Sequence, residues 1–286
     1  MNATCLACHF RKNLETAQAL GDEATATAFA KDLMRLYLQA PDDVASPYFG
    51  PGVTALFQKY YGLGEDRYIQ EKLDSNRFVM ARFDTIAARV RSQEDPVYAG
   101  LQFSILGNYL DFSALQGQVS FEKLDEMLDM GLNMELDRGC YEKLCRELEQ
   151  GKHLLYLTDN AGEIAFDRIC AEQIQKKYPH LQITFCVRGG PVLNDATRED
   201  AEAVGVPFKV IDSGNCIGGT ELRLLGKEAK EAFESADVIL AKGMGNNETL
   251  YGCGYNVYYA FLVKCELFVQ RFGKPMMTPM LVAERK

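Results

Sequence analysis

The residues best suited to chemistry in this chain are oxygen-bearing side chains that follow short apolar runs. Asp159 and Asn160 follow HLLYLT (153–158), and Asp195 lies in the segment after LQITFCV (181–187). Two carboxylates and an amide carbonyl are hard oxygen donors, which suit Mg²⁺ or Mn²⁺ better than zinc. With three protein ligands, such an ion keeps open positions for water and a phosphate oxygen. Because none of the three histidines falls in this cluster, we expect no histidine-based zinc site.

A lysine and several glycines follow a third apolar run. Lys242 comes directly after DVILA (237–241), where its ammonium would balance the charge of a phosphate. Gly243 and Gly245 allow backbone N–H groups to approach a ligand closely, and Asn246 adds polar reach. The residue order of a Walker phosphate-binding loop is absent here.

Each of these features has a simpler interpretation. An Asp-Asn pair after a strand is commonly a turn and a helix N-cap, and Asp195 also precedes a predicted helix. Lys242 taken alone would be an ordinary surface lysine. What favours a functional site is that polar, glycine-rich loops follow four successive predicted strands.

The elements that must position these residues lie after residue 151. Short apolar runs alternate with helical patterns. The runs are 153–158, 181–187, 208–211 and 237–241, and the helical segments are 162–178, 197–204 and 220–235. This order predicts an α/β fold with a mostly parallel sheet, helices on both faces and a ligand crevice beyond the carboxyl ends of the strands. VYYAFLVKC favours a further strand, and LVAE favours a last edge strand.

The first half of the chain has a helical pattern instead. Apolar residues recur at three- and four-residue steps from about residue 10 to 150, with prolines at the breaks. We therefore predict a helical cap domain over residues 1–150 and an α/β domain over residues 151–286 that binds metal and phosphate.

Composition limits the function further. The chain has 286 residues and a net charge of -9, the wrong sign for a general nucleic-acid binder. No apolar run approaches the ~20 residues that cross a bilayer, and nine cysteines without a disulfide pattern suggest a reducing compartment. We expect a cytoplasmic protein that binds a small phosphorylated metabolite and neither nucleic acid nor membrane. Its oligomeric state is left open.

Several motifs together resemble a known family, the damage-control phosphatases, also catalogued as domain of unknown function eighty-nine. The motifs are DNAGE (159–163), VLNDAT (192–197) and KGMGNNETL (242–250), with Cys5-x-x-Cys8 and GNYLDF (107–112) resembling its prokaryotic branch. The resemblance covers nearly the whole chain.

The resemblance implies a Rossmann-like core with a helical cap and a hydrolase that acts in metabolite repair. It implies that Asp159, Asn160 and Asp195 hold a divalent metal (Mg, Mn, Co or Ni), that Lys242 contacts phosphate, and that the substrates are phosphomonoesters such as sugar phosphates. The sequence leaves open whether water attacks phosphorus directly or an aspartate first forms a phospho-enzyme, and we favour direct attack by water. The residues expected to bind substrate around them are Asn108, Gly162, Glu163, Asn194, Gly243 and Asn246.

Two other functions are compatible with the same crevice. A methyltransferase would need an acidic residue after the second strand, where the sequence instead begins Arg188-Gly189-Gly190. A metal-dependent phosphometabolite sensor would use the same residues without turnover. The Cys5 and Cys8 pair beside His9 is typical of half a zinc site or a redox dithiol, and an inert role is equally compatible.

Overall fold

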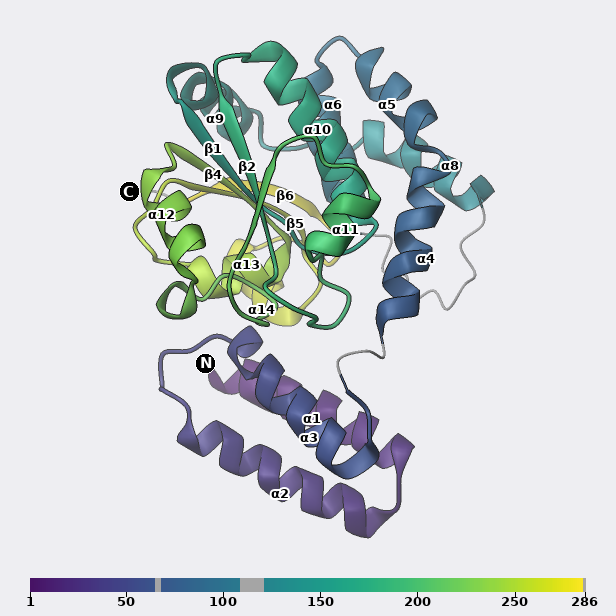
Figure 1. Ribbon diagram of the computed structural model, residues 1–286, viewed down its shortest axis with the longest axis vertical. Helices are drawn as coiled ribbons and strands as arrows, with labels where there is room; N and C mark the ends of the chain where they lie inside the picture. The colour runs from purple at the N-terminus through teal and green to yellow at the C-terminus, as the bar shows by residue number, and fades with distance from the viewer. Residues whose placement is uncertain (65–67, 109–120, 285–286) are drawn as a thin grey trace.

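The computed structural model describes residues 1–64, 68–108 and 121–284. As predicted, it has an α/β core and a helical N-terminal region (Figure 1). Within these ranges, no helix combines the length and the apolar character needed to span a bilayer.

One six-stranded sheet organises the α/β core. Its strands are β1 (His153–Leu157), β2 (Gln182–Val187), β3 (Lys209–Asp212), β4 (Val238–Lys242), β5 (Val257–Leu262) and β6 (Pro279–Ala283). Their order is β3-β2-β1-β4-β5-β6, and only β6 runs antiparallel to its neighbour. The predicted strands and edge strand are confirmed. Since the strand order reverses between β1 and β4, a crevice is expected there.

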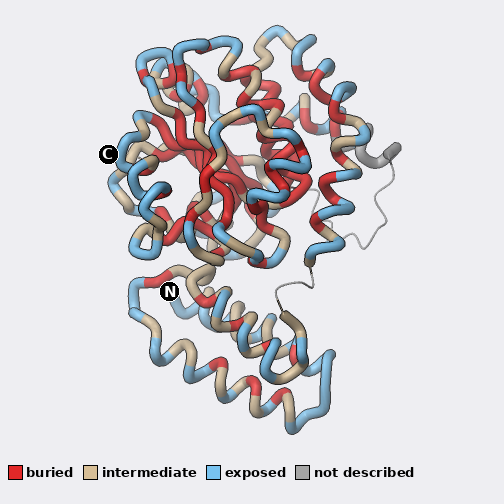
Figure 2. Tube along the Cα trace, in the orientation of Figure 1, coloured by how far each residue is buried: buried red, intermediate tan, exposed pale blue. Residues whose placement is uncertain are grey.

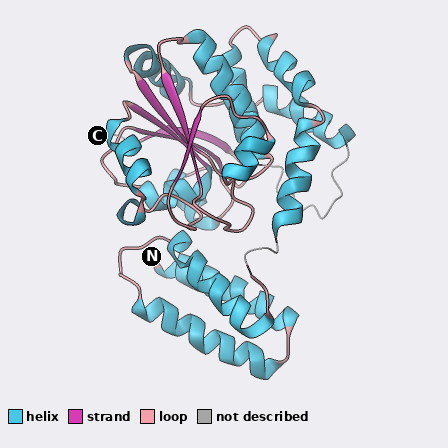
Figure 3. Ribbon diagram, in the orientation of Figure 1, coloured by secondary structure: helices cyan, strands magenta, loops and turns pink. Residues whose placement is uncertain are grey.

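Helices cover both faces of the sheet, because side chains along each buried strand alternate between two cores (Figure 3). Leu154 and Tyr156 of β1 pack on one face and Leu155 and Leu157 on the other. The core on the first face is shared with α4 (Ile69–Met80), α5 (Phe83–Arg91), α6 (Pro96–Gly107), α8 (Phe121–Leu132), α9 (Arg138–Gln150), α10 (Glu163–Lys177) and α11 (Arg198–Ala203). The second face is covered by α12 (Lys227–Ser235), α13 (Gly243–Leu250) and α14 (Glu266–Phe272).

Two expectations about loops and helix starts were wrong. The predicted loop after β4 is helix α13, whose Gly243 has a φ of 75° and whose Leu250 is fully buried. Burial against the sheet outweighs the low helix propensity of its glycines. The helix expected from residue 220 begins only at Lys227, after the 3-10 turn η3 (Leu222–Leu224).

The N-terminal helices form a bundle with a core of its own. It contains α1 (Ala3–Leu20), α2 (Glu23–Gln39), η1 (Ser46–Phe49) and α3 (Gly50–Tyr61). By contrast, the helices between residues 69 and 150 share one core with the sheet, so the predicted boundary at residue 150 does not separate the cores (Figure 2). The bundle meets the α/β core where η1 contacts α13 and where Arg223 pairs with Asp43 at 2.9 Å.

Candidate active site

The loops after β1 and β2 pair with each other and so bring the predicted metal ligands together. Asn160 and Asp195 form an isolated antiparallel bridge. Beside it, the N–H of Ala196 donates to the carbonyl of Asp159 at 2.7 Å. Asp159, Asn160 and Asp195 therefore lie side by side at the carboxyl edge of the sheet, next to the point where the strand order reverses.

Each aspartate uses one carboxylate oxygen within the protein. Oδ2 of Asp159 accepts hydrogen bonds from the side-chain amides of Asn108 and Asn160, both at 2.9 Å. Oδ2 of Asp195 accepts from Nε of Arg188 at 2.6 Å. Among the described residues, no hydrogen-bond donor reaches Oδ1 of either aspartate, and the nearest charged partner of Asp159 Oδ1 is Arg188 Nη2, at 3.9 Å.

The electrostatics of the site favour a bound cation. Burial is the main cause that raises the pKa of Asp159 well above its usual value, and the charges of Glu163 and Asp195 raise it further. Arg188 and Lys264 oppose this effect only in part. Burial likewise raises the pKa of Asp195, against the effect of Arg188. A divalent cation between these carboxylates would stabilise their ionised forms.

The donor set fits a hard divalent cation. The amide nitrogen of Asn160 donates to Asp159 and, at 3.0 Å, to Glu163, which leaves its carbonyl oxygen available as a ligand. Over the described ranges, no group of three or more His, Cys, Asp or Glu side chains has the arrangement of a metal site. The set predicted here consists of two carboxylates and one amide, and oxygen ligands of this kind suit Mg²⁺ or Mn²⁺.

Lys242 lies beneath the crevice and is not exposed to it. Its Nζ donates to Glu163 at 2.7 Å, to Asp167 at 2.8 Å and to the carbonyl of Ser104 at 2.8 Å. Its side chain is 0% exposed. The expectation that this ammonium reaches into the crevice to balance a phosphate is therefore not met in the structure.

The other predicted residues surround the site in different ways. Asn108 is the C-cap of α6 and donates to both Asp159 and Glu163. Gly162 is the N-cap of α10, with a φ of 75°. Asn246 is fully buried and donates to the carbonyl of Thr158 at 3.1 Å, so it supports the crevice from below.

Two further predicted residues act through their backbones. The carbonyl of Asn194 accepts from the N–H of Ala161 at 2.8 Å, which extends the pairing of the two loops. Gly243 begins α13, and a Cβ at this position would lie 2.1 Å from Oδ2 of Asp159. Of the GNYLDF motif, only Gly107 and Asn108 are described, and its remaining residues lie outside the described ranges.

Two basic residues of the site were not assigned a role from the sequence. Arg188 follows β2 and is 2% exposed, with Nη1 donating to the carbonyl of Gly219 at 2.8 Å. Lys264 follows β5, is partly exposed, and donates to the carbonyl of Asn108. Both lie at carboxyl ends of strands, so the rule that located Asp159 would have found them.

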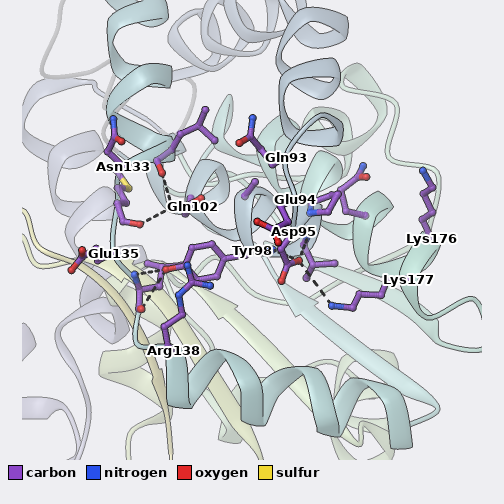
Figure 4. A pocket seen from close by; sticks show the side chains of 17 residues that line it. Gln93, Glu94, Asp95, Tyr98, Gln102, Asn133, Glu135, Arg138, Lys176 and Lys177 are labelled. Atoms are coloured by element: carbon purple, nitrogen blue, oxygen red, sulfur yellow. Dashed lines mark hydrogen bonds and ion pairs between the residues drawn. The ribbon is translucent and has the colours of Figure 1, made fainter.

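Two cavities differ in their relation to this site. A cavity of about 460 Å³ adjoins it, between Ile69 and Leu73 of α4 and the segment that runs from Arg188 to Leu193. A larger cavity of about 1230 Å³ lies elsewhere, beside Tyr98, Arg138 and Lys177 (Figure 4). Neither cavity is lined by Asp159, Asn160 or Asp195, but the smaller one reaches the site through Arg188, which pairs with Asp195 at 2.6 Å.

The cysteine pair lies outside the crevice. Cys5 and Cys8 are partly buried near the start of α1, and neither forms a disulfide. Burial is the main cause that raises the pKa of the Cys5 thiol, followed by the charges of Glu248 in α13 and Cys265 at the N-cap of α14. The metal-binding, redox and inert interpretations of this pair stay open.

Comparison with known proteins identifies the family. The sequence profile of the Damage-control phosphatase ARMT1-like domain matches residues 1–279. This chain belongs to the damage-control phosphatase family. A damage-control phosphatase of Pyrococcus horikoshii is 32% identical over 228 residues, which cover 78% of this chain and 77% of the relative. A damage-control phosphatase of Archaeoglobus fulgidus is 33% identical over 213 residues, covering 73% of each chain.

A solved structure agrees with this assignment. The crystal structure of a DUF89 family protein from Pyrococcus horikoshii matches with a TM-score of 0.80 and 27% identity, covering 100% of this chain and 99% of the other. The resemblance noted from the sequence motifs is thus confirmed. Family membership supports a phosphatase role in damage control for this chain.

Proposed function

We propose that this protein is a divalent-metal-dependent phosphatase that hydrolyses phosphomonoesters of small metabolites, such as sugar phosphates or damaged phosphometabolites. The observation that carries the proposal is the convergence of Asp159, Asn160 and Asp195 at one strand edge, each with an oxygen left for a cation. The adjoining cavity of about 460 Å³ lies within the range of small-molecule sites, about 300–1,000 Å³.

Positive groups at the same edge would receive the phosphate. Gly243 places the N-terminus of α13 against Asp159, and the N–H groups of a helix start favour an anion. Lys264 is the partly exposed cation of the site, whereas Lys242 is enclosed. We assign to Lys264 the role of balancing the phosphoryl charge.

The reaction is a displacement at phosphorus. Water forms the new P–O bond, the bond to the leaving alcohol breaks, and the products are inorganic phosphate and the free alcohol. A bound divalent ion would supply Lewis acidity to the phosphoryl oxygens. Asp159 and Asp195 are placed to hold that ion together with Asn160, so we favour direct attack by water over a phospho-aspartate.

One assay tests this function. Protein stripped of metal is offered sugar phosphates and a chromogenic phosphate ester, with Mg²⁺, Mn²⁺, Co²⁺ or Ni²⁺ added singly. We expect metal-dependent phosphate release that falls about 100-fold or more in Asp159→Ala, because each ligand fixes the metal geometry. Lys264→Met should raise KM more than it lowers kcat. Glu234→Gln, an exposed change on α12, serves as the control.

Each alternative outcome has a clear meaning. Full activity in Asp159→Ala would exclude the proposed site. Tight binding of a phosphometabolite without phosphate release in the wild-type protein would favour the sensor function.

A further inference from the structure

A buried ion network lies directly under the proposed metal site. Lys242 is enclosed between Glu163 and Asp167, and all three side chains are at most 1% exposed. The ammonium has three protons, and it has three acceptors: the two carboxylates and the carbonyl of Ser104. Burial opposes the charge of Lys242, yet Asp167 and Glu163 raise its pKa above the usual value. With its three protons donated to these acceptors, Lys242 has no donor left for a substrate.

Glu163 connects this cation to the metal site. Its Oε1 accepts from Lys242 at 2.7 Å. Its Oε2 accepts from the side-chain amides of Asn108 at 2.8 Å and Asn160 at 3.0 Å. Both amides turn their NH₂ groups towards Glu163, whose Oε2 accepts from each of them. Their carbonyl oxygens then face away from it, and that of Asn160 is the oxygen expected to bind metal.

Asp167 lies one turn further along α10 than Glu163 and completes the network. Its Oδ1 accepts from Lys242 at 2.8 Å, from Oγ of Ser104 at 2.7 Å and from the hydroxyl of Tyr156 at 3.0 Å. Its Oδ2 is buried and has no hydrogen-bond partner among the described residues. A buried polar atom without a partner costs about 1–3 kcal/mol. Such atoms are rare and call for a functional explanation.

We propose that Asp167 is a positioning residue of the phosphatase, and that it acts through Lys242 and Glu163 on the amide ligand Asn160. Lys242 is shared between two carboxylates and uses only one oxygen of Glu163. The other oxygen, Oε2, therefore stays available to accept hydrogen bonds from the two amides. Without the charge of Asp167, Lys242 pairs with Glu163 alone and competes for that carboxylate. The proposal rests on the proposed metal-dependent function of this site.

The main test compares two changes at the same carboxylate. Asp167→Asn removes the charge and keeps the shape, whereas Tyr156→Phe leaves the charge in place and removes a hydroxyl that contacts Asp167 and Ser104. Mn²⁺ binding to the full-length protein is measured by calorimetry, and Tm is measured alongside it. Asp167→Asn should weaken Mn²⁺ binding about 10–100-fold, the usual effect of losing an outer partner of a metal ligand. Tyr156→Phe should leave it within about threefold.

A double-mutant cycle tests whether Asp167 acts through Lys242. If it does, Asp167→Asn combined with Lys242→Met should bind Mn²⁺ as weakly as Lys242→Met alone, because the two effects are not additive. The double variant loses one negative and one positive charge, so the net charge of the network is unchanged. It can therefore be used for the test if Asp167→Asn does not fold. Saturating Mn²⁺ should restore most of the kcat of Asp167→Asn, which a general loss of structure would not do.

Three results would overturn the proposal. They are wild-type Mn²⁺ affinity in Asp167→Asn or in the double variant, equal weakening by Asp167→Asn and Tyr156→Phe, and additive effects in the cycle. Failure of the proposed function looks different, because the wild-type protein itself would then neither bind Mn²⁺ nor release phosphate, and both proposals would fall.

Discussion

At the scale of single residues, the absence of a side chain at Gly243 is as important to the site as the carboxylate beside it. Gly243 has a φ of 75°, a conformation that L-residues rarely adopt. A Cβ at this position would lie 2.1 Å from Asp159 Oδ2, far inside van der Waals contact. The backbone of α13 therefore reaches the carboxylate only because residue 243 has no side chain.

Gly243→Ala should lose both stability and activity. The positive φ costs about 1–2 kcal/mol, and displacement of Asp159 should lower kcat/KM about 100-fold. The matched control is Gly252→Ala, since Gly252 has a φ of 82° with no atom within 4 Å of the added Cβ. In denaturant unfolding, the positive φ should lower the free energy of unfolding by a similar amount in both variants. Phosphate release should fall only in Gly243→Ala. An equal loss of activity in both would refute this account.

At the scale of elements, α13 connects the crevice to the N-terminal bundle. It starts beside Asp159, and η1 of the bundle contacts it. Glu248, in the last turn of this helix, is partly buried. Burial raises its pKa to about 7, against the opposing charges of Arg271 and Lys12. This carboxyl group thus makes the packing of α13 sensitive to pH.

Glu248→Gln should stabilise the protein at pH 8 and much less at pH 5. The pKa of Glu248 is raised in the folded state, from 4.5 to about 7. The stability associated with its protonated form is therefore complete below pH 4.5 and is lost as the pH rises towards 7. We expect a gain of about 1–3 kcal/mol in the free energy of unfolding at pH 8, measured by urea titration. If Glu248 instead acts mainly as a partner of Arg271, the variant will be less stable than wild type at pH 8.

At the scale of the whole molecule, the N-terminal bundle has a hydrophobic core separate from the cores on the two faces of the sheet. Phe29 is fully buried and packs on Phe57 with ring centroids 4.8 Å apart. Both rings belong to the core of the bundle. None of the buried residues of that core belongs to the core that contains α10 and the sheet. Regions with separate cores open with separate free energies.

Phe29→Ala should loosen the bundle and leave the active-site core intact. Removing the ring costs about 3–5 kcal/mol in a packed core. Hydrogen exchange should accelerate over α1, α2 and α3, while amides of α10 and the sheet keep their protection. Leu38→Ala, at a position of α2 that is 85% exposed, is the control and should change stability by less than about 0.5 kcal/mol. Equal acceleration in α10 would show that the chain unfolds as one unit.

The sequence by itself determined the α/β architecture and the family, and it predicts where the site lies. Apolar runs such as HLLYLT have the length and composition of buried strands, and parallel strands place the residues that follow them at one edge. Asp159, Asn160 and Asp195 could therefore be selected, and the motifs around them identified the family. These signals are local, so they are visible in the order of residues.

Only the tertiary structure decided what the charged side chains do. Lys242 follows its strand as predicted, but its ammonium points beneath the crevice because Glu163 and Asp167 of α10 lie there. Lys264, which follows the neighbouring strand β5, is a partly exposed cation instead. Residues separated by 75 and 79 positions from Lys242 determine its direction. Such long-range charge pairing leaves no periodic pattern in the sequence, whereas burial of strands does.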